Sequence, residues 1–193
     1  MDRDGPRPLL EVLLAKKRAI VDEWLARTLQ SYPEHTGRFL SQERDPFRNP
    51  VGSTFKDALP LLVDAVLGEV DTARVTPALD GIVRIRAVQD FTPGQAIAFV
   101  FLLRPVIRGA LGTQGRDGPD RDALEALESR IDALALLAFD LFMRCREQIY
   151  EIRANEARRR TAVLERRHRL DSLADPGDSE APAEPHSWCS GLT

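Results

Sequence analysis

Four polar side chains stand close together just before an apolar run, and they are the residues best placed to do chemistry. They are Arg84, Arg86, Gln89 and Asp90, and the apolar run covers residues 96–103. Two arginines beside a helix start are suited to hold an anion or a protein partner. A structural role is the favoured interpretation, because Asp90 is placed to accept backbone N–H groups and pin a corner between two helices. Asp80 also lies four residues before Arg84, an order that favours a surface ion pair.

Asn49 belongs to the same set of candidates for a ligand or partner site. It precedes Pro50, and an asparagine followed by a proline is a common start of a helix, so capping accounts for both residues. Gly52 then falls early in the expected helix, where glycine costs stability. We therefore expect another backbone segment to pass close to Gly52.

The sequence carries no pattern of an enzyme. No serine or cysteine lies near a histidine in a nucleophile motif, and no glycine-rich phosphate loop is present. The three histidines, His35, His168 and His186, do not fall on an apolar helical face where a haem ligand belongs. His186 and Cys189 supply two metal ligands where a structural site needs three or four. We expect a non-catalytic protein without metal or cofactor, and therefore a colourless one.

Charge is unevenly distributed along a chain whose net charge is −3. Residues 144–170 carry nine arginines against four glutamates, whereas residues 171–193 carry five carboxylates and neither lysine nor arginine. The basic segment is interleaved with glutamate and lacks stacking aromatic residues, so nucleic-acid binding is not expected. The N-terminus lacks a signal-peptide pattern, and the run 96–103 is shorter than the ~20 residues that span a bilayer. We expect a cytoplasmic protein that does not insert into membranes.

Helical periodicity runs through most of the chain, and no strand pattern competes with it. Thr76-Pro77 and Thr92-Pro93 are predicted helix starts, the second with a capping box completed by Gln95, and Pro60 and Pro105 are predicted kinks. The predicted helices cover residues 8–30, 34–41, 50–68, 76 to about 90, 93–112 and 120–170. This pattern predicts an all-α, single-domain helical bundle with a long projecting C-terminal helix.

The long helix is apolar on nearly every side in its first half. A heptad-like seam from Leu124 to Cys145, extended by Ile149 and Ile152, suits pairing with another helix and predicts a homodimer. The interface candidates are Leu134, Leu141, Phe142, Ile149 and Ile152. Four segments are expected: a flexible N-terminus (1–8), a helical domain (9–155), a projecting charged helix (156–170) and a disordered acidic tail (171–193).

Two motifs, Arg84-Ile-Arg-Ala-Val-Gln-Asp-Phe-Thr-Pro-Gly-Gln-Ala96 and Asp45-Pro-Phe-Arg-Asn-Pro-Val-Gly52, resemble the N-terminal sensory domain of RsbT co-antagonist proteins, the RsbRD N-terminal family. The resemblance implies a regulatory module of bacterial stress signalling, with a globin-like fold that lacks haem and tends to dimerise. Co-antagonists of this kind continue into a STAS output domain of about a hundred residues, which we do not expect after Leu170.

The expected function is therefore that of a sensory module that acts through a regulatory protein partner. The alternative is a small-ligand carrier in which the arginines near the helix corner hold an anion or a cofactor.

Overall fold

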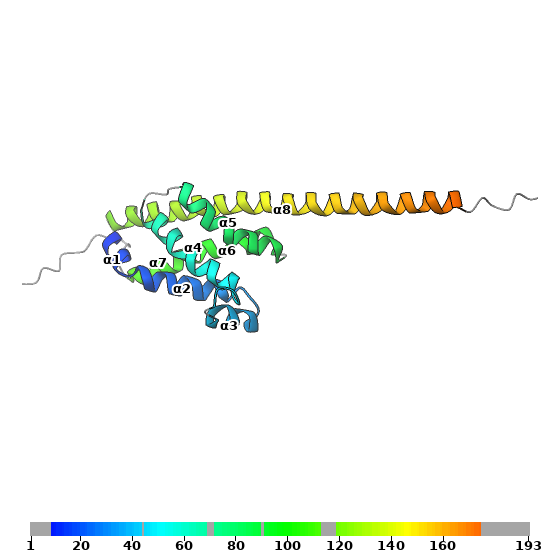
Figure 1. Ribbon diagram of the computed structural model, residues 1–193. Helices are drawn as coiled ribbons and strands as arrows, with labels where there is room; N and C mark the ends of the chain where they lie inside the picture. Colours follow the sequence, from blue (N-terminus) through cyan, green and yellow to red (C-terminus); the bar gives the residue numbers. More distant parts are fainter. Residues whose placement is uncertain (1–8, 44, 69–71, 90, 113–118, 175–193) are drawn as a thin grey trace, which may run out of the picture. The chain divides into compact units, whose positions relative to one another are not determined.

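The computed structural model describes residues 9–43, 45–68, 72–89, 91–112 and 119–174 of the chain. The chain divides into two compact units, residues 1–148 and 149–193. Within the described residues all regular structure is helical, which confirms the all-α prediction (Figure 1). The helices are α1 (Leu9–Ala15), α2 (Lys17–Leu29), α3 (Glu34–Gln42), α4 (Pro50–Leu67), α5 (Thr72–Val88), α6 (Pro93–Phe101), α7 (Leu103–Leu111) and α8 (Pro119–Ala174).

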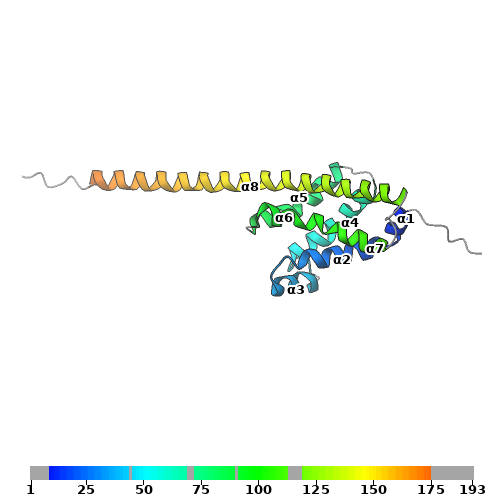
Figure 2. The ribbon, with the colours of Figure 1, turned by 180° about the vertical axis from the view of Figure 1, so that it is seen from behind.

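The core of the first unit lies around α4, which packs against both α5 and α2. Figure 2 shows α2 and α7 beside each other, and their contact is direct. Trp24 on α2 is fully buried, donates its indole N–H to the carbonyl of Phe99 at 2.6 Å and stacks on the Phe99 ring. Burial of this indole is favourable because its single N–H donor makes a hydrogen bond.

The part of α8 that belongs to the first unit is held to three other helices by arginines. Arg130 donates to the carbonyl of Val66 at the end of α4, and Arg146 to that of Ala87 near the end of α5. Arg104 and Arg108 of α7 pair with Asp132 and Glu128 of α8. Apolar side chains of the same segment, such as Leu127 and Ile131, are buried, so the first half of the predicted long helix is part of the core.

The N-terminal helix is broken, contrary to the single helix expected over residues 8–30. The break is at Lys16, which has φ −99° and ψ 7°, outside the helical region. Its ammonium group donates to the carbonyl of Ala110 at 2.6 Å, in the last turn of α7. A cation at a helix C-terminus is favourable, and this long-range contact has no signal in the local sequence.

Two other predicted boundaries differ from the structure. The fifth helix begins at Thr72, so Thr76 and Pro77 lie inside it and the predicted start was wrong. Val75 is buried, so the apolar face begins before the proline. The helix expected over 93–112 is interrupted at Leu102, between α6 and α7. The interruption precedes Pro105, which has no N–H to give to the carbonyl of Phe101.

The 19 residues Pro93–Leu111 are long and apolar enough to cross a membrane by length and composition alone. In the fold, however, eight of them are buried, among them Phe99, Val100 and Leu103. The core of the first unit therefore accounts for the apolar character of this segment.

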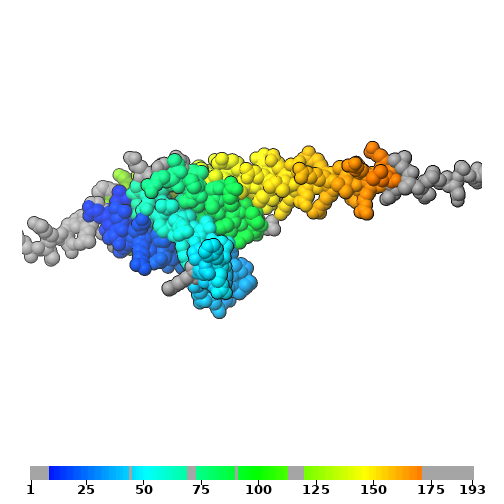
Figure 3. All heavy atoms as spheres, in the orientation of Figure 1, coloured from blue at the N-terminus to red at the C-terminus, as the bar shows by residue number. Residues whose placement is uncertain are grey.

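The second unit contains the continuation of α8. Every side chain from residue 150 to residue 170 is exposed, and Figure 3 shows the atoms of this segment, coloured yellow to orange, at the surface. Arg160 and Glu156 form an ion pair one turn apart. The boundary between the units lies at Gln148, seven residues before the domain boundary at 155 expected from the charge pattern. The acidic tail is predicted to begin at residue 171, whereas α8 extends to Ala174; the rest of the predicted tail, residues 175–193, lies outside the described residues.

Candidate functional site

The corner between α5 and α6 is built by the predicted capping box. The hydroxyl oxygen of Thr92 accepts the backbone N–H of Gln95 at 3.3 Å, and the side-chain oxygen of Gln95 accepts the backbone N–H of Thr92 at 3.0 Å. Pro93 occupies the first turn of α6, where it has no hydrogen bond to lose. This start of α6 places the carbonyl of Gln95 next to Arg86, in the last turn of α5.

Arg86 is the most unusual residue of the fold, because its side chain is fully buried (0% exposed). Nη1 donates to the carbonyl of Gln95 at 3.0 Å and Nη2 to the hydroxyl of Ser31 at 3.1 Å. Four aromatic rings surround the guanidinium, with ring centroids 5.0–5.6 Å from its central carbon. These rings are Tyr32, Phe55, Phe91 and Phe99. The arrangement is an aromatic cage around a cation.

The charge of Arg86 is compensated by these rings rather than by a carboxylate. Within the described ranges of the chain, no carboxylate lies within ion-pair distance of Arg86, and its Nε has no hydrogen-bond partner. Burial lowers the pKa of Arg86, and the neighbouring Tyr32 works against that shift. The side chain nevertheless stays charged at neutral pH, because guanidinium has a very high intrinsic pKa.

Tyr32 is the second buried polar group of this cage. Burial raises the pKa of its phenol, and Arg86 partly offsets the rise. Among the described residues its hydroxyl has no hydrogen-bond partner in good geometry. Tyr32 follows the end of α2 and precedes Pro33 and α3, so the turn that joins these helices carries both Ser31 and Tyr32 to Arg86.

The other polar residues of the predicted set are dispersed. Arg84 is exposed and pairs with Asp80 at 2.6 Å, as expected for a surface pair, and the hydrogen bond that Arg84 donates to the Asp80 carboxylate raises the pKa of Arg84. Gln89 is exposed. Asp90 lies outside the described residues. Among the described residues of the cluster Arg84, Arg86 and Gln89, only Arg86 is buried.

The side chain of Asn49 joins the start of α4 to the preceding segment through three hydrogen bonds, an arrangement that we call the Asn49 clamp. Its side-chain oxygen accepts the backbone N–H of Gly52 at 2.8 Å, which confirms the predicted cap of α4. Its amide nitrogen donates to the carbonyls of Leu40 and Glu43 at 2.9 and 3.0 Å. The expected close approach at Gly52 is also present, because a Cβ there would lie 2.6 Å from the carbonyl oxygen of Leu40.

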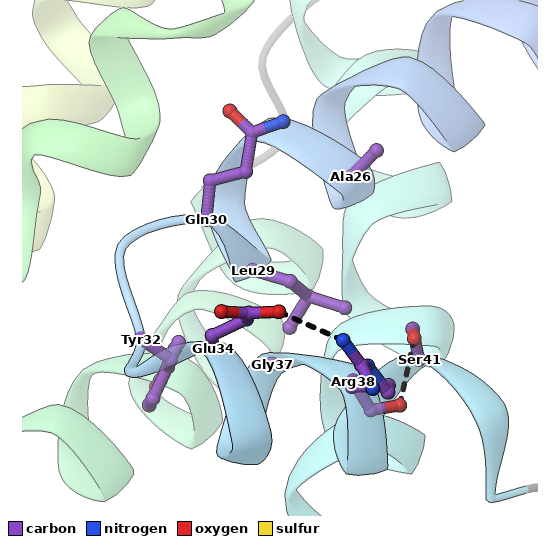
Figure 4. Close-up of a pocket in the computed structure, with 8 residues that line it drawn as sticks. All are labelled: Ala26, Leu29, Gln30, Tyr32, Glu34, Gly37, Arg38 and Ser41. Carbon is purple, nitrogen blue, oxygen red and sulfur yellow. Dashed lines mark hydrogen bonds and ion pairs between the residues drawn. The ribbon is translucent and has the colours of Figure 1, made fainter.

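A pocket of about 590 Å³ opens between α2 and α3, and Figure 4 shows its lining residues. They are Ala26, Leu29, Gln30, Tyr32, Glu34, Gly37, Arg38 and Ser41. Glu34 and Arg38 form an ion pair at 2.7 Å within this lining. Tyr32 therefore belongs both to the pocket and to the cage around Arg86. The sequence interpretation missed Ser31 and Tyr32, because both fall between the predicted helices 8–30 and 34–41.

The interface candidates on α8 fall into two groups. Leu134, Leu141 and Phe142 are buried in the core of the first unit, whereas Ile149 is half-buried and Ile152 is exposed. A different apolar row on α8 is exposed and recurs every seven residues. In the first unit it consists of Leu136 and Met143, 69% and 46% exposed, and in the second unit Tyr150, Ala157 and Leu164 continue the interval. We call these five residues the heptad row.

Histidines and metal ligands add no further site. His35 and His168 are both exposed, and His186 is not described. In the described part of the chain, no three histidine, cysteine, aspartate or glutamate side chains converge in a way that would hold a metal ion.

Comparison with known proteins places these features in a family context. The family model of the RsbT co-antagonist protein rsbRD N-terminal domain matches residues 18–157, a range that contains the Arg86 cage and the Asn49 clamp. An uncharacterized protein from Archaeoglobus fulgidus is 27% identical over 143 residues, which is 72% of this chain and 83% of the archaeal protein. No solved structure matches the chain.

Proposed function

The chain belongs to the RsbT co-antagonist protein rsbRD N-terminal domain family, and on that premise we propose that it is a cytoplasmic sensory module that pairs with a second copy of itself through α8. The family implies a regulatory role of the stressosome type and no catalysis. The partner that receives the signal is a regulatory protein. The globin-like helix arrangement implied by the resemblance stays a prediction.

The heptad row is the observation that carries the pairing. A soluble helix exposes scattered apolar side chains without consequence, but a row that recurs every seven residues is the pattern of helices that pair. The row contains Leu136, Met143 and Leu164 at large exposed fractions. A second copy of the same helix offers the same row, so a two-fold pair covers both rows at once.

We propose a parallel orientation for the pair. In a parallel two-fold pair each residue of the heptad row lies beside its own copy, so the two rows cover each other in register.

Two substitutions on α8 test this surface against the seam predicted from the sequence. Met143→Glu places a carboxylate in the heptad row, and Ile152→Glu is the matched control, since Ile152 is an exposed apolar residue of the same helix on another face. Light scattering coupled to size-exclusion chromatography should show a dimer for the natural chain and for Ile152→Glu, and a monomer for Met143→Glu. A dimeric Met143→Glu with a monomeric Ile152→Glu would instead support the predicted seam.

Orientation is tested by a cysteine at the fourth position of the row. In a Cys189→Ser background, Ala157→Cys should form an intermolecular disulfide under mild oxidation, because parallel two-fold pairing sets residue 157 against its own copy. Cys145 is buried and should not compete. If the light-scattering dimer forms and no disulfide appears, parallel pairing is wrong while pairing itself stands.

A further inference from the structure

We propose that the pocket between α2 and α3 binds a small monocarboxylate with an apolar body, and that Arg86 receives its carboxylate group. The proposal concerns binding alone, and only the role of this ligand as the sensed signal rests on the proposed sensory function.

The first argument is the incomplete set of partners around Arg86. A guanidinium has five N–H donors, and burial without an anion leaves some of these donors without a partner. Here two hydrogen bonds are made, to Gln95 and Ser31, and Nε–H has no partner among the described residues. Nε–H and one Nη2–H form the fork that a carboxylate accepts with two oxygens.

The second argument is that the pocket and the guanidinium share one wall. Gln30 and Tyr32 line the pocket, and Ser31 between them accepts the hydrogen bond from Arg86. The Tyr32 ring lies 5.4 Å from the guanidinium carbon. Tyr32 and Arg86 interact directly, and the Tyr32 hydroxyl has no other partner among the described residues. The ring must therefore turn away from Arg86 before a carboxylate reaches the guanidinium, and the carboxylate then replaces this interaction. The Tyr32 ring is therefore the group that separates a ligand in the pocket from Arg86.

The third argument concerns the size and chemistry of the pocket. Its volume of about 590 Å³ lies within the range of small-molecule sites. Ala26, Leu29 and Gly37 supply apolar or backbone lining. Glu34 is paired with Arg38 in the same lining, so the pocket adds no net positive charge of its own. One negative charge on an apolar body suits this arrangement better than a multiply charged phosphate.

Calorimetric titration with sodium octanoate tests the site in the full chain. We expect saturable binding at millimolar or lower concentration, and at least tenfold weaker binding of the neutral octanamide. Ala26→Phe fills the pocket from an exposed position, and it should weaken octanoate binding at least tenfold. Ala19→Phe is the matched control on an exposed position of the same helix outside this pocket, and it should leave binding within twofold.

Arg86→Met removes the positive charge that is proposed to bind the carboxylate and leaves a long side chain in its place. It should weaken octanoate binding at least tenfold. If this variant fails to fold, Ala26→Phe and the octanamide comparison decide the question without it. The proposal is overturned if octanoate does not saturate, if octanamide binds equally well, if Ala26→Phe leaves binding unchanged, or if inorganic phosphate binds as tightly as octanoate. None of these outcomes affects the dimer test on α8, so the two proposals fail separately.

Discussion

Replacement of Asn49 offers the sharpest test of how the α3–α4 connection is held. Asn49 is 2% exposed and makes three hydrogen bonds, one as the cap of α4 and two to carbonyls of the preceding segment. Asn49→Ala removes a cap worth about 1 kcal/mol. It also leaves buried groups unpaired, at about 1–3 kcal/mol each. We expect a total loss of about 3 kcal/mol in the free energy of unfolding.

Asn49→Asp separates the cap from the clamp. Aspartate caps helices as well as asparagine does, so a residue that only capped α4 would tolerate this change. In the structure, however, the amide nitrogen faces the carbonyls of Leu40 and Glu43, and a carboxylate oxygen in its place would repel both. We therefore expect Asn49→Asp to lose at least as much stability as Asn49→Ala. Thr92→Ala is the control, because it removes an exposed cap worth about 1 kcal/mol.

Urea unfolding followed by Trp24 fluorescence measures these losses in the first unit, in a Trp188→Phe background. With a urea slope of about 2 kcal/mol per molar, a loss of 3 kcal/mol moves the midpoint by roughly 1.5 M. An Asn49→Asp protein as stable as the natural one would refute the clamp and reduce Asn49 to a cap. So would an Asn49→Ala loss no larger than that of Thr92→Ala.

Three further outcomes follow from buried groups. Gly52→Ala should lower the urea midpoint because its Cβ would meet the carbonyl of Leu40, whereas Gly94→Ala meets no atom within 4 Å and should be neutral or stabilising. Because burial raises the pKa of Tyr32, the folded state favours the neutral phenol. The resulting stabilisation is complete below pH 10, the usual pKa of a tyrosine, and is lost as the pH rises through the folded-state pKa. Unfolding measured from pH 9 to 11 should show this loss, and Tyr32→Phe should abolish it. Leu141→Glu should unfold the first unit, because it buries a carboxylate in the core, whereas truncation after Asn155 should leave that unit folded; circular dichroism distinguishes the two results.

Local rules were sufficient where a residue acts on its own neighbours in the chain. The Asn49 cap, the Thr92–Gln95 box and the long α8 all follow from short-range patterns, and each is present in the structure. The break at Lys16 is different, because the carbonyl that it caps lies 94 residues away. A contact at that separation leaves no trace in a window of a dozen residues.

The faces of α8 show a second limit of sequence reasoning. Its buried seam, which includes Leu134 and Leu141, and its exposed heptad row, which includes Leu136 and Met143, are both apolar and both have helical spacing. Periodicity identifies two candidate faces, but only the packing of the other helices decides which one becomes core. Arg86 is similar, because an arginine is normally exposed and nothing in its local sequence announces an aromatic cage.

The reactivity of the Cys145 thiol reports how often the interior of the first unit opens. The thiol is buried in the first unit on α8, and burial raises its pKa, so both access and thiolate formation are suppressed in the closed fold. In a Cys189→Ser chain, the rate of labelling by a thiol reagent, divided by the rate for a free cysteine peptide, gives a protection factor for Cys145. When closing is fast relative to labelling, that factor converts directly into the free energy of local opening. Octanoate added to the same reaction would then report whether filling the α2–α3 pocket changes how tightly the distant α8 is held.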